Sequence, residues 1–135
     1  MWIQIRPGSD EPIYQQVIEQ ISKAIARGDL VSGDKLPAVR KLASELVINP
    51  NTVARAYSQL EQGGLVVTKT GSGTFVSDPK LRQTDAADIN ALTVRMDTLI
   101  TRGLNLGIEP RELTDLFDKR LAKFTKTSDK RMEEK

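Results

Sequence analysis

Between residues 51 and 58 the chain carries hydrogen-bonding side chains whose spacing places them on one side of a helix. They are Asn51, Thr52, Arg55 and Ser58. Short or forked side chains of this kind bind base edges and phosphates in the major groove of DNA. The other side of the same helix is apolar at positions i, i+3, i+4 and i+7, with Val53, Ala56, Tyr57 and Leu60. An ordinary solvated face of an amphipathic helix is the competing interpretation.

The element that positions these side chains is predicted to be the second helix of a helix-turn-helix. Asn49 is a preferred N-cap, and Pro50 suits the first helical position because it has no N–H to leave unpaired. Apolar residues recur at helical spacing in the preceding segment, at Leu36, Val39, Leu42, Ala43 and Leu46. This segment predicts a first helix that ends shortly before Pro50, and so short a joint makes two helices cross steeply.

A glycine-tipped β-hairpin is predicted directly after this motif. Gly63-Gly64 ends the helix, and residues 65–69 and 74–77 are rich in strand-forming side chains. The residues expected to approach a phosphate or a minor groove are Lys69, Thr70, Gly71, Ser72 and Gly73. A nucleotide phosphate loop fits less well, because no strand-loop-helix context follows. A helix-turn-helix followed by a hairpin predicts a mostly α winged-helix domain with a small β-hairpin wing, and DNA binding is the first hypothesis.

Composition excludes several classes of function. The 135 residues include no Cys and no His, which rules out disulfides, thiolate or imidazole metal sites and Cys–His or Ser–His catalysis. We therefore expect no enzyme activity, no cofactor and no metal. Because no apolar run approaches membrane-spanning length and no signal peptide is present, we expect a cytoplasmic protein without a membrane partner.

Charge is nearly balanced, at a formal +2 for the whole chain, and residues 1–79 carry eight Lys/Arg against eight Asp/Glu. A non-specific DNA binder usually has a basic stripe. Phosphate affinity must instead come from local placement of Lys35, Arg40, Lys41, Arg55 and Lys69. We expect a specific binder of double-stranded operator DNA that needs two protomers. The balanced charge also leaves open a winged-helix adaptor that binds proteins without specific DNA binding.

The chain is predicted to divide into a winged-helix domain at residues 1–79 and a linker with a helical segment at residues 80–135. The first part begins with a short strand at residues 2–5 and a helix from Pro12 to Gly28. In the second part, residues 80–88 form a polar linker. Helices at 88–102 and 110–124 follow, with a break at Gly103 to Gly107, and the charged residues 126–135 are expected to fray.

The two carboxy-terminal helices are amphipathic and cannot bury their apolar faces alone. They can fold back on the winged domain or pair with a second copy; we favour a homodimer, because a helix-turn-helix needs two half-sites. The residues predicted to dimerise are Ile89, Leu92, Met96, Leu99, Leu113, Leu116, Phe117 and Leu121. A third possibility is a pocket for an unidentified small-molecule effector. Its polar lining would come from Arg95, Asp97, Thr98, Arg102 and Asn105, which also suit solvated outer faces.

Over residues 10–77 the chain resembles the GntR family of bacterial transcription regulators, and its short carboxy-terminal segment is most similar to the YtrA subfamily. The matching motifs are PIYQQ at 12–16, LP at 36–37, RKLA at 40–43, NPNTVARAY at 49–57, LE at 60–61 and GSGTFV at 71–76. The resemblance implies a dimeric winged-helix repressor. It also implies that Arg40, Thr52 and a wing-tip glycine, Gly71 or Gly73, contact DNA.

The chain departs from the family pattern at three places. Many relatives have a helix-capping Ser where this chain has Ala38, and its absence costs about 1 kcal/mol. A common Ser-Arg pair is replaced by Asn49-Pro50, which removes one arginine contact, although Asn49 stays among the expected DNA-binding residues. An arginine often found at the position of Ala54 is shifted to Arg55, which turns the side chain by roughly 100 degrees around the helix.

Overall fold

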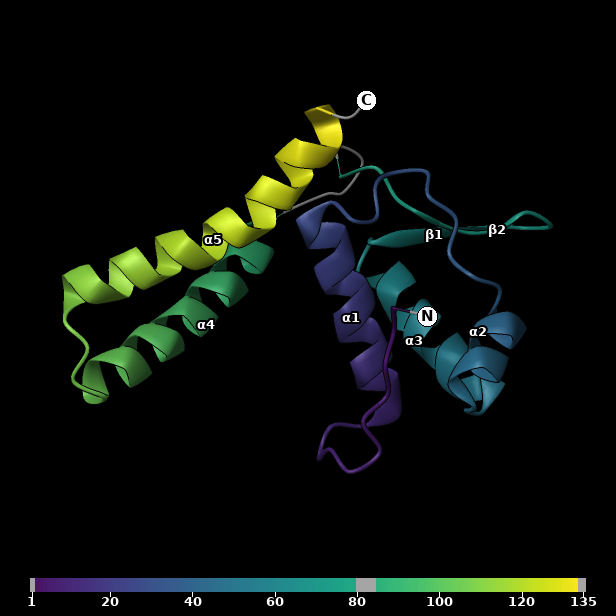
Figure 1. Cartoon of the computed structure of the whole chain (residues 1–135), viewed down its shortest axis with the longest axis horizontal. Helices are drawn as coiled ribbons and strands as arrows, with labels where there is room; N and C mark the ends of the chain where they lie inside the picture. Colours follow the sequence, from purple (N-terminus) through teal and green to yellow (C-terminus); the bar gives the residue numbers. More distant parts are fainter. Residues whose placement is uncertain (1, 80–84, 134–135) are drawn as a thin grey trace.

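The computed structural model describes residues 2–79 and 85–133, with side chains placed as far as residue 125. Five helices and one hairpin follow each other in the order α1 (Ile13–Arg27), α2 (Val39–Leu46), α3 (Pro50–Gln62), β1 (Val66–Lys69), β2 (Gly73–Val76), α4 (Ala86–Asn105) and α5 (Pro110–Glu133). The first three helices and the hairpin form the winged helix, and α4 and α5 form an antiparallel pair that extends away from it (Figure 1). This arrangement confirms the predicted fold class.

The hydrophobic core lies where α1 and α2 pack on α3. Its buried side chains include Ile3, Val17, Ile21, Leu42, Val53 and Leu60. All four predicted apolar positions of α3 are buried, and burying one aliphatic side chain stabilises the fold by roughly 1.5–3 kcal/mol. The burial of that stripe determines which face of α3 points outward.

The predicted amino-terminal strand at residues 2–5 is wrong, because this segment pairs with side chains of α1 rather than with another strand. The Gln20 amide accepts from the Gln4 N–H at 2.9 Å and donates to the Gln4 carbonyl at 2.8 Å. Gln16, which is buried, does the same for Arg6 at 2.8 and 3.1 Å. Two glutamines therefore supply the hydrogen bonds that a neighbouring strand would make.

Helix α2 is shorter than its apolar pattern suggested, since it begins at Val39 and Leu36 lies before it in the connecting segment. Its N-cap is Ala38, which offers no side chain to the helix start. Its C-cap is Val47, at φ 56° and ψ 51°. This left-handed conformation is costly for a β-branched residue, and it turns the chain sharply into α3.

The wing is a two-stranded antiparallel sheet in which Lys69 pairs with Gly73 at the tip. The segment before α2 lies along the other edge of β2. The Leu36 N–H donates to the Thr74 carbonyl at 2.8 Å, and the Val76 N–H donates to the Asp34 carbonyl at 2.8 Å. This connection attaches the wing to the helix-turn-helix.

The carboxy-terminal helices are longer than predicted. Asp85 caps α4 through reciprocal hydrogen bonds with Asp88, so the helix starts within the predicted linker, of which residues 80–84 lie outside the described part. Gly103 lies inside α4 rather than in the break, which falls at Gly107 with φ 87°. α5 continues to Glu133, so the segment expected to fray is helical over residues 126–133.

Helix α5 packs against α1 as well as against α4. At α1 the Arg27 guanidinium lies over the Phe124 ring, 5.1 Å from its centroid. At α4, Gly103 is buried against Leu113, and a Cβ on this glycine would come within 2.8 Å of the leucine Cδ1. These contacts within one chain bury part of α4 and α5, but they leave most of the apolar faces of both helices exposed.

Candidate nucleic-acid interface

The outward face of α3 is built from its amino-terminal cap. The Asn51 N–H donates to Asn49 Oδ1 at 2.8 Å, and the Thr52 N–H donates to the Asn49 carbonyl at 2.9 Å. Pro50 has no N–H. Since the first amides of the helix are already paired, recognition at this end must depend on side chains. The Asn49 side-chain oxygen is used by the cap, and its amide N–H₂ remains available as a donor.

The predicted recognition residues lie as expected on the face of α3 that is turned away from the core. Asn51, Arg55 and Ser58 are exposed, and Thr52 is half-buried. Hydrogen-bonding side chains on the outer face of a helix are the arrangement that reads base edges in the major groove.

Arg55 makes a contact that the sequence pattern did not indicate. Its guanidinium carbon lies 3.8 Å from the centroid of the Tyr14 ring in α1. A cation this close to an aromatic face is attracted by the ring quadrupole. Arg55 therefore bridges α3 and α1 while remaining exposed.

Two basic residues occupy the first turn of α2. Arg40 and Lys41 are both exposed, and they follow Ala38, an N-cap residue whose side chain makes no hydrogen bond to the helix. The amino-terminal end of a helix carries partial positive charge, so cations there are unfavourable unless an anion approaches. Two cations beside unpaired helix amides favour a phosphate at this position.

Two further lysines lie beside the wing. The Lys69 ammonium is 5.1 Å from the centroid of the Phe75 ring. The Lys35 side chain, from before α2, passes so close to Gly73 that a Cβ there would come within 2.8 Å of Lys35 Cε. Gly73 also has φ 123°, and Gly71 at the tip has φ 81° with open space around it. Both glycines are required by their conformation.

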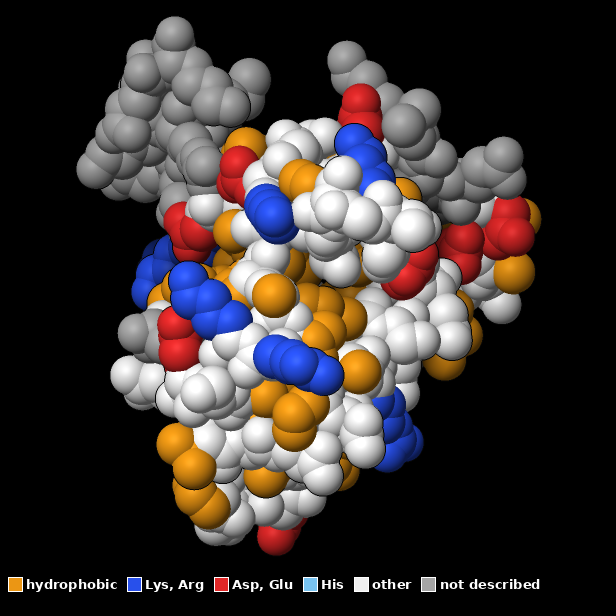
Figure 2. Space-filling model, turned by 90° about the vertical axis from the view of Figure 1, so that its right-hand side faces the viewer, with side chains coloured by type: hydrophobic (Ala, Val, Ile, Leu, Met, Phe, Trp, Pro, Cys, Tyr) orange, Lys and Arg blue, Asp and Glu red, His pale blue; other side chains and the backbone are white. Residues whose placement is uncertain are grey.

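The wing tip presents small polar groups to solvent. Thr70, Gly71 and Ser72 are exposed at the end of the hairpin, and the Ser72 N–H closes the turn on the Lys69 carbonyl at 2.9 Å. Figure 2 shows Lys and Arg side chains spread between polar and apolar ones rather than gathered in one band. This distribution agrees with the balanced charge of residues 1–79.

Seven of the eight predicted dimerisation residues are exposed, and Leu113 alone is half-buried against Gly103. Leu99 is 69 % exposed and Phe117 is 52 % exposed. Large apolar side chains along two adjoining helices are typical of a surface that another molecule covers.

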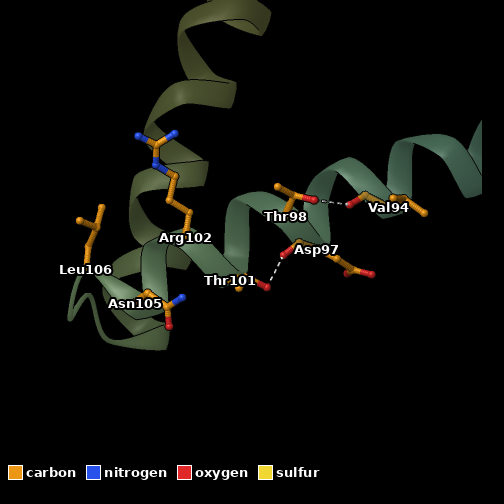
Figure 3. A pocket seen from close by; sticks show the side chains of 7 residues that line it. All are labelled: Val94, Asp97, Thr98, Thr101, Arg102, Asn105 and Leu106. Carbon is orange, nitrogen blue, oxygen red and sulfur yellow. Dashed lines mark hydrogen bonds between the residues drawn. The ribbon is translucent and has the colours of Figure 1, made fainter.

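The polar groups considered for an effector pocket fall along one helix. Asp97, Thr98, Arg102 and Asn105 border a groove of about 580 Å³ together with Val94, Thr101 and Leu106, whereas Arg95 does not line it. Six of these seven residues belong to α4, and Leu106 is the residue that caps its carboxy-terminal end (Figure 3). The threonine hydroxyls donate to carbonyls of their own helix, Thr98 to Val94 at 3.2 Å and Thr101 to Asp97 at 2.8 Å. An open groove on a single helix provides little enclosure for a ligand.

The described residues contain no group of three or more His, Cys, Asp or Glu side chains placed to hold a metal ion. None of the helices in that part of the chain has the length and apolar character needed to cross a membrane.

Comparison with known proteins agrees with this geometry. The family model "Bacterial regulatory proteins, gntR family" matches residues 13–76. The HTH-type transcriptional repressor YtrA of Bacillus subtilis is 37% identical over 82% of this chain and 85% of its own. The crystal structure of a transcriptional antiterminator from Listeria monocytogenes EGD-e superposes with a TM-score of 0.77 at 28% identity, over 89% of this chain and 90% of that one. YtrA from Sulfolobus acidocaldarius, described as a GntR-family transcription factor, gives a TM-score of 0.59 at 34% identity, over 73% of this chain and 99% of that one.

Proposed function

The chain belongs to the GntR family of bacterial regulatory proteins and is a DNA-binding transcription regulator rather than an enzyme, and on that premise we propose that it represses transcription as a homodimer. Each protomer would place α3 in the major groove of one half-site of an operator. The alternative of a winged-helix adaptor that binds proteins without specific DNA binding is set aside, because the family binds DNA.

The observation that carries the DNA-binding proposal is the outward face of α3. Asn51, Arg55 and Ser58 are exposed on a helix whose opposite face is buried, so α3 can present these hydrogen-bonding side chains toward a groove. Arg40 and Lys41 would hold a phosphate at the start of α2, where helix amides and two cations coincide. The wing, with Lys35 and Lys69 beside it, would follow the adjacent backbone or minor groove.

The exposed apolar faces of α4 and α5 support the homodimer. A second copy presents the same faces, and pairing them would remove side chains such as Leu92, Leu99 and Phe117 from water. The two recognition helices would then be held at the spacing of one operator. Repression is proposed from the repressor YtrA of Bacillus subtilis, to which the chain is similar over most of its length. Because the bacterial chromosome lies in the cytoplasm, the protein would act there.

The test is a fluorescence-anisotropy titration against DNA from upstream of the protein's own gene, with a scrambled duplex as control, at two salt concentrations. We expect tight binding to the upstream duplex, saturating at two protomers per site. Sedimentation of the free protein should give the dimer. Equal, weak and steeply salt-dependent binding to both duplexes would contradict specific recognition of that DNA. Saturation at one protomer per site would contradict the dimer.

Matched variants assign the contacts. Arg40→Ala should weaken binding to both duplexes and reduce the salt slope by about one, because a phosphate contact carries no sequence information. Asn51→Ala should reduce the preference for the upstream duplex by about 1–3 kcal/mol. Lys23→Ala, which removes an exposed charge of α1 that lies beside the amino-terminal segment, is the control and should leave binding unchanged. Unaltered affinity in Arg40→Ala would remove that residue from the interface.

A further inference from the structure

Arg55 and Tyr14 form the closest cation–aromatic contact among the described residues. The guanidinium carbon lies 3.8 Å from the ring centroid, against 5.1 Å for Arg27 on Phe124 and for Lys69 on Phe75. Tyr14 is half-buried at the start of α1 and packs against the core, so its ring is held in place by the fold. The arginine, by contrast, extends from the exposed face of α3.

The contact leaves the hydrogen-bonding edge of the guanidinium unused. Among the described residues, none accepts a hydrogen bond from the Arg55 side chain or forms an ion pair with it. A guanidinium has five N–H donors in its plane, and a ring that covers one face does not block that edge. The ring therefore restricts the long side chain to one position while its donors stay open to solvent.

The direction of the contact indicates which part of DNA the donors meet. Tyr14 belongs to α1, which flanks α3, so the guanidinium is drawn to the side of the recognition face instead of to its centre. The sugar-phosphate backbone lies at the rim of a groove that α3 enters, and a guanidinium matches phosphate oxygens with two parallel N–H groups.

We propose that Tyr14, which lies outside the helix-turn-helix, is a positioning residue for DNA binding that holds Arg55 ready for a backbone phosphate. The inference rests on the proposed function, since α3 must enter the groove. Tyr14 itself need not touch DNA. Its contribution is to order the arginine before DNA arrives, so that less side-chain freedom is lost on binding.

The experiment measures binding of the full chain to a labelled random-sequence duplex and to the upstream duplex, from about 50 to about 200 mM salt. The variants are Tyr14→Phe, Tyr14→Leu, Arg55→Ala and the double variant Tyr14→Leu with Arg55→Ala. Phe keeps the ring, and Leu keeps apolar bulk for the core. Thermal unfolding of each variant accompanies the titrations, so that a loss of folded protein is not mistaken for a loss of affinity.

Arg55→Ala should weaken binding to both duplexes by the same factor and lower the salt slope by about one. Tyr14→Leu should weaken binding about twofold to fivefold with little change in slope, because the arginine is still present. Tyr14→Phe should bind like the parent protein. In the Arg55→Ala background, Tyr14→Leu should have no further effect, since the residue acts only through the arginine.

The same loss from Tyr14→Leu with and without Arg55 would overturn the inference, as a merely structural role predicts that result. An unchanged salt slope in Arg55→Ala would also overturn it, while specific binding by the parent protein would leave the proposed function standing. If the parent protein bound neither duplex, that result would contradict the proposed function and, with it, this inference.

Discussion

Replacing Val47 should stabilise this protein, although the residue lies in the turn of the helix-turn-helix. Val47 is the one non-glycine residue with positive φ in the described part of the chain, at φ 56° and ψ 51°. A left-handed conformation costs an L-residue about 1–2 kcal/mol, and a β-branched side chain is a particular outlier there. Asn adopts this conformation several times more readily because its side chain can hydrogen-bond locally.

The expected gain for Val47→Asn is about 1 kcal/mol in the free energy of unfolding. Little is lost in return, because the Val47 side chain is 88 % exposed and its burial contributes only about a few tenths of a kcal/mol. The turn hydrogen bonds are made by backbone groups, with the Ile48 N–H donating to the Ala43 carbonyl at 3.0 Å. They remain available in the variant.

Urea denaturation followed by circular dichroism measures the gain, with Val47→Ala as the matched control. Ala removes the branch but keeps a Cβ, so it should recover only part of the stabilisation. The unfolding midpoint on heating should rise by about 4–8 °C in Val47→Asn if a 60–100-residue unit melts cooperatively. An Asn variant no more stable than the Ala variant would refute the argument that this turn is strained.

Three further changes have defined outcomes. Burial raises the pKa of Tyr57 to about 12, so the neutral phenol stabilises the folded protein, and this stabilisation is lost as pH rises from 10 toward 12. In pH-dependent denaturation, Tyr57→Phe should therefore lose less stability over that pH range than the parent protein. At neutral pH the same variant should cost about 1 kcal/mol, because the Tyr57 hydroxyl donates to the Pro37 carbonyl at 2.8 Å. Ala38→Ser should add about 1 kcal/mol by capping α2, and an unchanged urea midpoint would contradict it. Gly103→Leu should cost about 1–3 kcal/mol by overpacking against Leu113, whereas Gly103→Ala, which meets only the flexible end of that leucine, should stay within about 1 kcal/mol in the same assay.

The helices and the wing could be predicted from the sequence because their signals are local. The Asn49-Pro50 cap located the start of α3, and the period of its apolar residues identified the buried face. The end of α1 followed from Gly28, which has φ 82°. The end of α4 was predicted too early because Gly103 reads as a helix breaker in isolation. Its packing against Leu113 favours a small residue there, and no local pattern indicates that neighbour.

The candidate interface follows the same division. The sequence by itself determined which side chains of α3 face outward, since a buried stripe fixes the opposite face of a helix. Only the tertiary structure brought Tyr14 beneath Arg55, placed Lys35 against Gly73, and paired the amino-terminal segment with Gln16 and Gln20. Each of these contacts joins residues far apart along the chain. The packing of the helices determines these contacts, and the spacing of residues within one segment does not indicate that packing.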